Sequence, residues 1–335
     1  MPNPTQSDLH VNIPLTNVSV AYMQSADSYI ADKVFPKCPV AKQSDLYWKY
    51  SKSDWRRTDV KRRAPSTETP GVGWNMTTDQ YFAHVYGVHK DIDDQIRANA
   101  DSNFNLDRDA TEFVTNQMLL KRDIDWVNSY FKTGIWATER AGVTAGPTGT
   151  QFLRWDQAGS DPLTLIPHYQ TEFRRLTGFA PNVGVMGPYV MNALKQHPDI
   201  VDRIKYTQRG IVTEDLIATL FDLDELYVSY ATVATGPQIP DAAAQDAAAD
   251  FDFIANPTSF WMGYVPSSPS LLTPSAGYTF TWSGYLGGNS QGIRVKRFRM
   301  EHIASDRIEA EMTYDMKPVC LDMGLFLSDV VDAPA

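Results

Sequence analysis

The sequence predicts an α+β fold, and three features of its patterning indicate this class. Residues 106–132 have helical spacing without glycine or proline, residues 162–234 alternate between helical and strand patterns, and the chain from Phe251 onward is mostly strand-like. With 335 residues, of which 43% are hydrophobic, the chain can bury a substantial core as two domains or one elaborated domain.

The overall charge and the first residues exclude several classes of protein. The formal net charge is −10, whereas proteins that bind nucleic acid mainly through phosphates normally carry a basic balance. The opening MPNPTQSDLHVNIPL lacks the positive start and apolar run of a signal peptide, and no apolar run could span a membrane. We therefore expect a cytosol-like compartment. Cys38 and Cys320 have no CxxC partner and are expected to be reduced and buried.

Residues 1–45 are expected to form an extended arm, because five prolines interrupt them (Pro2, Pro4, Pro14, Pro36 and Pro39). Such an arm cannot fold alone, so its apolar positions need another surface, such as a neighbouring subunit. These positions are Ile13, Leu15, Val18, Val20 and Tyr22.

Residues 46–92 are expected to form a long two-stranded ribbon. The run from 46 to 76 ends in turn signals at Pro70, Gly71 and Gly73, and the next run, TTDQYFAHVYGVHKDI, is rich in aromatic and β-branched residues. Seven basic and two acidic residues between 49 and 63 give a local charge of +5, which leaves −15 on the rest of the chain. An isolated ribbon is marginal in water, so this one also needs a partner.

The long helix is expected over residues 106–132, with a length of about 40 Å at 1.5 Å per residue. Its apolar stripe is expected to consist of Phe113, Leu120, Ile124, Val127 and Phe131. Gly134 follows as a plausible stop signal.

The middle of the chain indicates an α/β layer with its own core. PLTLIPHYQTEFRRLTG, GPYVMNALKQHPDIVDRIK and IVTEDLI have helical patterns, whereas NVGVMG and LYVSYATVA have strand patterns. IPDAAAQDAAAD, residues 239–250, is expected to be a surface loop. The strand-rich end contains FIANPTSFWMGYV, YTFTW, IRVKRFRM and RIEAEMTYDMKPVCLDMGLFL.

A metal site at His84, His89 and Asp91 would indicate a hydrolase, but the spacing argues against it. Two histidines five positions apart point to opposite faces of a strand and lie about 140° apart around a helix. The aspartates that follow lack the glycine and glutamate of an EF-hand. The segment is better interpreted as a strand that leads into a polar turn or short helix.

Other catalytic patterns are absent from the sequence, which contains no GxxxxGK[ST], HExxH or GxGxxG motif. SGYLGGNSQG, residues 283–292, lacks the lysine and the following helix of a phosphate-binding loop and is expected to be a hairpin loop. His168, His197 and His302 have no nucleophile beside them in the sequence. We therefore expect no enzymatic activity, and no cofactor or metal.

The basic ribbon has three interpretations: nucleic-acid contact, contact with an acidic surface of another copy, or simple solvation. The separation of +5 from −15 favours contact between copies, because a basic projection and an acidic body attract head to tail. The candidate inter-subunit contact residues are Lys49, Lys52, Trp55, Arg56, Arg57, Lys61, Arg62 and Arg63.

The order of arm, charged ribbon, long helix, α/β middle and strand-rich end resembles the major capsid proteins of tailed bacteriophages, which have the Hong Kong 97-like fold. Three stretches carry the resemblance further: LRWDQAGSDPL (153–163), LTGFAPNVGVMGPYVMNALKQHPDIVDRIKY (176–206) and LFDLDELYVSYA (220–231). They are similar to the segment that builds the axial domain in that family.

The resemblance implies a division of the chain into named parts. Residues 1–45 would be the N-terminal arm, 46–78 the E-loop, 79–150 the peripheral domain with its spine helix, and 151–289 the axial domain. Residues 290–320 would return to the peripheral domain as strands, and 321–335 would end as a strand on the axial domain.

The resemblance also implies a function: a structural protein whose hexamers and pentamers close into an icosahedral head that encloses phage DNA. Its partners would be a separate scaffolding protein, a portal and a possible decoration protein, with double-stranded DNA held without sequence-specific binding. Assembly would take place in the host cytoplasm, and the product would be the virion. The alternatives are an encapsulin-like compartment shell, a nucleic-acid-binding protein and a metal-dependent hydrolase.

Overall fold

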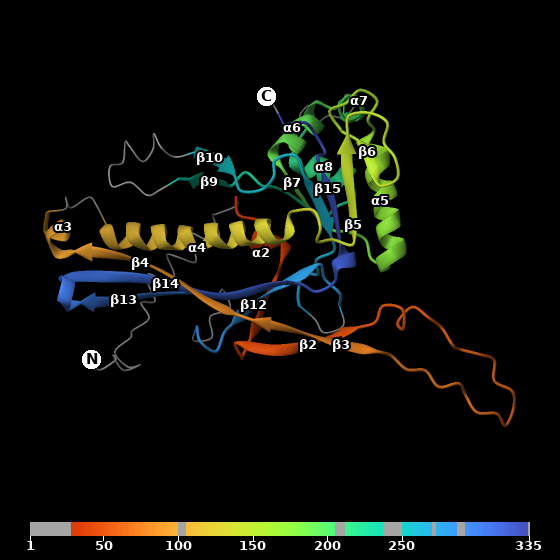
Figure 1. The fold of residues 1–335 in the computed structure, drawn as a ribbon, viewed down its shortest axis with the longest axis horizontal. Coiled ribbons are helices and arrows are strands. Elements are labelled where there is room, and N and C mark those ends of the chain that lie inside the picture. Colours follow the sequence, from red (N-terminus) through yellow and green to blue (C-terminus); the bar gives the residue numbers. More distant parts are fainter. Residues whose placement is uncertain are drawn as a thin grey trace.

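The computed structural model describes residues 28–99, 105–204, 212–236, 250–269, 273–286 and 292–333. Within these, two sheets and a long helix form the body, and a two-stranded ribbon extends from it (Figure 1). The apolar arm positions from Ile13 to Tyr22, and most of the predicted surface loop at 239–250, lie outside the described residues.

The long helix α4 spans Leu106–Tyr130, close to the predicted range. Asn105 caps its first turn by accepting a hydrogen bond from the Arg108 amide at 3.1 Å. The positive end of the helix dipole stabilises the carboxylates of Asp107 and Asp109, which lie in that turn.

The predicted apolar stripe of α4 is buried only in part. Val127 and Phe131 are buried as predicted, whereas Phe113 is 53% exposed. The full buried face of α4 consists of Ala110, Thr111, Val114, Thr115, Met118, Leu119, Arg122, Asp123, Trp126 and Val127. This face contains four polar residues, so apolar periodicity alone does not predict it. Polar groups tolerate burial here because partners satisfy them: Thr111 and Thr115, for example, donate to carbonyls one turn earlier.

One sheet lies along α4. Its order is β1 (Lys37–Val40), β12 (Gly277–Trp282), β14 (Ser305–Pro318) and β13 (Ile293–Met300), and β4 (His84–Asp93) also pairs with β14. β14 and β4 are antiparallel from Ser305↔Asp93 to Tyr314↔His84. α4 packs on these two strands, and Figure 1 shows helix and strands running side by side.

The second sheet has six strands in the order β6 (Gln151–Leu153), β5 (Thr138–Val143), β15 (Gly324–Ser328), β11 (Phe260–Gly263), β7 (Val183–Met186) and β8 (Glu225–Val228). Four helices accompany it: α5 (Pro162–Thr177), α6 (Pro188–Gln196), α7 (Pro198–Ile204) and α8 (Glu214–Leu220). All residues of β7 and β11 are buried, which explains their continuous apolar sequences.

The two sheets share one continuous hydrophobic core. Trp126 of α4 meets Trp261 of β11 edge to face at 6.3 Å, and Trp136 lies 5.4 Å from the same ring. Aromatic pairs in such geometry add to the stabilisation from burial alone. The long helix is therefore fixed to both sheets.

Two further strand pairs project from this body. β2 (Ser44–Tyr50) pairs with β3 (Met76–Phe82), and β9 (Thr232–Thr235) pairs with β10 (Asp250–Phe253). The predicted ribbon is thus confirmed only at its base, because residues 51–75 contain no strand. The second leg of the predicted ribbon also divides at Ala83, after which β4 joins the first sheet.

Short helices complete the described chain: α2 (Ala31–Val34), α3 (Asp94–Asn99), η1 (Glu301–Ile303) and η2 (Leu321–Met323). His302 lies in η1, directly after β13 ends at Met300. Cys38 and Cys320 are free and half-buried, less covered than expected.

The strands within residues 79–150, and also those within residues 151–289, are divided between the two sheets. β5, within residues 79–150, joins the second sheet, and β12, within 151–289, joins the first. β15, within 321–335, lies in the second sheet between β5 and β11.

Candidate assembly surface

The ribbon formed by β2 and β3 packs on the body through one face. Tyr81 stacks on Phe280 of β12 at 4.6 Å, and Tyr47 lies 5.4 Å from the same ring. Lys49 Nζ lies 2.6 Å from Asp79 Oδ2, and the pKa of Asp79 is lowered mainly by this hydrogen bond. This face is therefore already occupied within the chain.

The opposite face of the ribbon is apolar and exposed. Side chains alternate along a strand, and residues paired across an antiparallel ladder share a face. Leu46, Trp48 and Tyr50 of β2 therefore lie on one side together with Met76, the register partner of Tyr50. Leu46 is 60% exposed and Trp48 is 58% exposed. Contiguous apolar surface of this kind marks an interaction site.

Residues 51–75, which we name the loop, continue this exposed apolar surface. Figure 1 shows the loop extending away from the body. Trp55, Val60, Val72 and Trp74 are all exposed, Val60 to 87%. The sequence prediction emphasised the charge of this region and included only one of its apolar residues, Trp55, although the alternation of Leu46, Trp48 and Tyr50 was a usable signal.

The structure separates the eight predicted contact residues into three groups. Lys52 and Arg56 contact other parts of the same chain: Asp322 and the Leu176 carbonyl, respectively. Four more interact within the ribbon and loop: Lys49 with Asp79, Trp55 with the Tyr50 ring, Arg57 with Asp59, and Arg63 with the Thr67 carbonyl. Lys61 and Arg62 form no ion pair with any residue that the structure describes.

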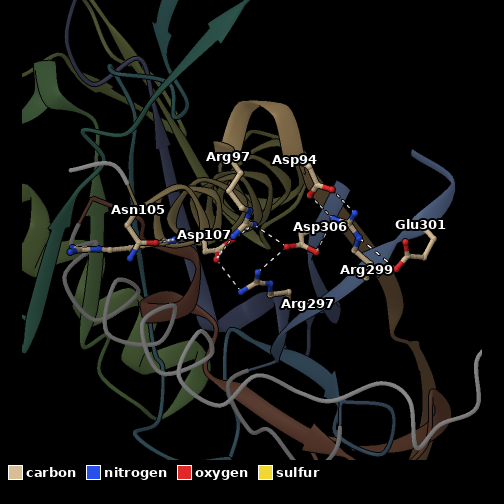
Figure 2. A network of polar contacts seen from close by, with 9 residues as sticks. Asp94, Arg97, Asn105, Asp107, Arg297, Arg299, Glu301 and Asp306 are labelled. Carbon is tan, nitrogen blue, oxygen red and sulfur yellow. Dashed lines mark hydrogen bonds and ion pairs between the residues drawn. The ribbon is translucent and has the colours of Figure 1, made fainter. Parts of the chain in front are cut away.

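A network of ion pairs fixes the end of α4 farthest from the second sheet (Figure 2). Arg297 of β13 lies 2.9 Å from both Asp107 and Asp306, and Arg97 of α3 also contacts both carboxylates, at 2.8 and 3.0 Å. The pKa of Asp306 is lowered, chiefly by the hydrogen bond from Arg297. Beside it, Arg299 forms a two-point contact with Asp94.

The three residues of the candidate metal site do not converge on one point, although His89 Nε2 lies 3.9 Å from Asp91 Oδ2. His84 and His89 both lie in strand β4 at an odd spacing, so their side chains point to opposite faces. Asp91 accepts hydrogen bonds from Arg307 at 2.7 and 2.9 Å. In the described part of the chain, no group of three or more His, Cys, Asp or Glu could hold a metal ion.

Ser160, His197 and Asp199 lie together but are arranged as a structural cap. Ser160 Oγ is 3.1 Å from His197 Nε2, while His197 Nδ1 accepts a hydrogen bond from the Asp199 amide. The imidazole therefore carries its proton on Nε2 and donates to serine, which is the wrong tautomer for a base. The serine hydroxyl is within reach of the Trp155 and Gln157 carbonyls.

Among the helices that the structure describes, none is long and apolar enough to cross a membrane.

Comparison with curated proteins finds two phage relatives. The chain is 30% identical to the major capsid protein of Pseudomonas phage JBD67 over 222 residues, which cover 65% of this chain and 67% of the relative. It is 25% identical to the major capsid protein of Burkholderia phage BcepMu over 66% of this chain and 69% of the relative. No protein-family model matches the chain.

Solved structures agree on the fold. A phage-related protein from Bordetella bronchiseptica aligns with a TM-score of 0.71 at 21% identity, over 97% of this chain and 99% of that one. The mature capsid of bacteriophage PhiM1 aligns with a TM-score of 0.54 at 12% identity, over 88% and 84%. The fold is thus the Hong Kong 97-like fold of phage capsid subunits, as predicted.

The fold and the exposed ribbon together define a structural subunit of a protein shell. The chain belongs to the major capsid proteins of phages. It is accordingly a virion component and not an enzyme, and the compartment-shell, nucleic-acid-binding and hydrolase alternatives are not favoured.

Proposed function

We propose that this chain assembles as hexamers and pentamers into a closed icosahedral head around double-stranded DNA. The observation that carries the proposal is the exposed apolar face of the ribbon and loop. Trp48, Trp55 and Trp74 are each at least 58% exposed in the single chain. A neighbouring copy would cover them, and many modest interfaces would add up to a durable particle.

Each part of the chain would correspond to one part of a capsid subunit. The first sheet with α4 would form the peripheral domain, and the second sheet with its helices would form the axial domain. Residues 1–45 would act as the N-terminal arm and 46–78 as the E-loop. Sheet membership supports assigning β5 and β15 to the axial domain and β12 to the peripheral domain.

The charge distribution supports head-to-tail contact between copies. Lys61, Arg62 and Arg63 lie in the projecting loop, whereas the rest of the chain outside residues 49–63 carries −15. Opposite charges on projection and body would steer each loop toward a neighbour. An acidic body would also hold DNA without adhering to it. A scaffolding protein, a portal and possible decoration proteins would complete assembly in the host cytoplasm.

Electron microscopy of the purified chain, alone and with its phage's scaffolding protein, tests the proposal. We expect closed shells, or rings of six and five subunits. Replacing Arg62 and Arg63 with glutamate should abolish these particles while leaving the circular dichroism and unfolding of the subunit unchanged. Persistent monomers under all these conditions would contradict assembly, and normal shells from the variant would contradict the role of loop charge.

A further inference from the structure

The loop divides into two parts with different surroundings. Near the ribbon, its backbone forms a turn in which the Arg56 and Arg57 amides donate to the Ser53 carbonyl at 3.2 and 3.0 Å. Asp54 Oδ2 joins the two legs by accepting from the Asn75 amide at 2.8 Å and from its side chain at 3.0 Å. Residues 51–57 with Asn75 therefore form a closed unit, which we name the loop base.

Two cations hold the loop base against the second-sheet side of the body. Lys52 Nζ lies 2.5 Å from Asp322 Oδ2 in η2, 270 positions later in the chain. Arg56 Nη1 donates to the Leu176 carbonyl at 2.6 Å. That carbonyl belongs to the last turn of α5, where carbonyl groups lack helical partners and the helix dipole favours a cation.

Gly178 permits this close approach. It ends α5 in the left-handed conformation, with φ of 81°, and its amide bonds to the Arg174 carbonyl. A Cβ at this position would lie 2.2 Å from Arg56 Nη2. The C-terminal end of α5 is thus shaped to receive this guanidinium.

Beyond Arg57 the described contacts of the loop are with itself. Arg57 pairs with Asp59, and Arg63 donates to the Thr67 carbonyl. This outer part, residues 58–74, holds the exposed Val60, Val72 and Trp74 together with Lys61 and Arg62. Lys52 and Arg56 therefore contact the body of their own chain, whereas Lys61 and Arg62, a few positions later, lie on the exposed outer part of the loop.

We propose that Lys52 and Arg56 form an intrachain clamp that sets the direction of the loop before assembly, so that residues 58–74 project toward a neighbouring copy. For the role of the outer part, this inference rests on the proposed function. The clamp itself is a property of the single subunit. Because its two contacts lie on η2 and on the end of α5, they hold the loop base at two points, which restricts rotation about the ribbon axis.

Hydrogen–deuterium exchange on the unassembled full chain tests the clamp. Lys52→Asp and Arg56→Ala should each raise exchange at the Ser51 and Arg57 amides by about two- to fivefold, because the contacts that they remove are solvent-exposed and local opening becomes moderately easier. Arg57→Ala is the matched control, since Arg57 is adjacent and equally charged but pairs only within the loop. Combining Lys52→Asp with Asp322→Lys should restore protection.

Unchanged exchange in Lys52→Asp and Arg56→Ala would overturn the clamp, as would an equal increase in Arg57→Ala. Assembly of the same variants gives a separate readout: the clamp variants should form fewer regular shells than the Arg57→Ala control. If exchange changes as expected while the parent chain forms no shells, the clamp stands and the proposed function fails. If the parent chain forms shells and the clamp variants show unchanged exchange, the proposed function stands and the clamp fails.

Discussion

The guanidinium of Arg122 on α4 contacts the carboxylate of Asp32, 90 positions earlier in the chain, at 2.5 and 2.6 Å. The Arg122 side chain is 2% exposed. Burial alone would raise the pKa of Asp32, but the Arg122 and Lys37 cations and their hydrogen bonds together outweigh burial and hold that pKa below its usual range. This pair joins the described part of the arm to the helix at the centre of the core.

Asp32→Asn should destabilise the subunit by about 3–5 kcal/mol, because it leaves a buried guanidinium without its counter-charge. The matched control is Arg108→Ala, which breaks the more exposed Arg108–Glu112 pair on the same helix and should cost less than about 1 kcal/mol. Chemical denaturation of the unassembled chain measures both. Equal effects would show that burial of Arg122 is unimportant.

Asp123 should make stability depend on pH. Burial raises its pKa to about 6, although Oδ1 accepts hydrogen bonds from the Ile30 and Ala31 amides, both at 2.9 Å. A raised native pKa gives stability that is complete below about pH 4 and lost as pH rises through about 6. The unfolding free energy of the parent minus that of Asp123→Asn should therefore fall across this window. A difference in unfolding free energy that does not change with pH would refute the raised pKa of Asp123.

The buried face of α4 can be checked with two truncations. Met118→Ala should cost about 2–5 kcal/mol, because it leaves a cavity in the core. Phe113→Ala removes a larger but 53% exposed side chain and should cost less than about 1 kcal/mol in the unassembled subunit. Thermal or denaturant unfolding decides between the observed face and the stripe expected from periodicity.

The ion-pair network around Asp306 should be sensitive to acid. Its lowered pKa means that its stabilising contribution is present above about pH 4 and lost as pH falls through the native value. Asp306→Asn should therefore lose less stability than the parent between pH 4 and pH 2. An identical acid profile in both proteins would indicate that Asp306 is not a significant source of acid sensitivity.

Much of this fold could be predicted from local patterns. The uninterrupted run at 106–132 predicted α4 to within two residues at its end, and the segments NVGVMG and FIANPTSFWMGYV contain the buried strands β7 and β11. Long-range pairing could not be read in the same way. β12 lies next to β14 and β1 because of partners that are distant in sequence, and no local pattern records this.

The candidate site was predicted only in part for a similar reason. Charge segregation identified the loop, but every basic residue there looked equivalent in the sequence. The partners that distinguish Lys52 and Arg56 from Lys61 and Arg62 are Asp322 and the Leu176 carbonyl, more than 100 positions away. The buried face of α4 was missed in part because Arg122 and Asp123 are core residues through their contacts with the described part of the arm.

The central claim is that the outer part of the loop is covered by a neighbouring copy in a closed shell. A cryo-electron microscopy reconstruction of assembled particles measures this directly. We expect Val60, Val72 and Trp74 of each subunit to lie against an adjacent subunit, with Lys61 and Arg62 near its carboxylates. Shells in which residues 58–74 remain in solvent would contradict the account.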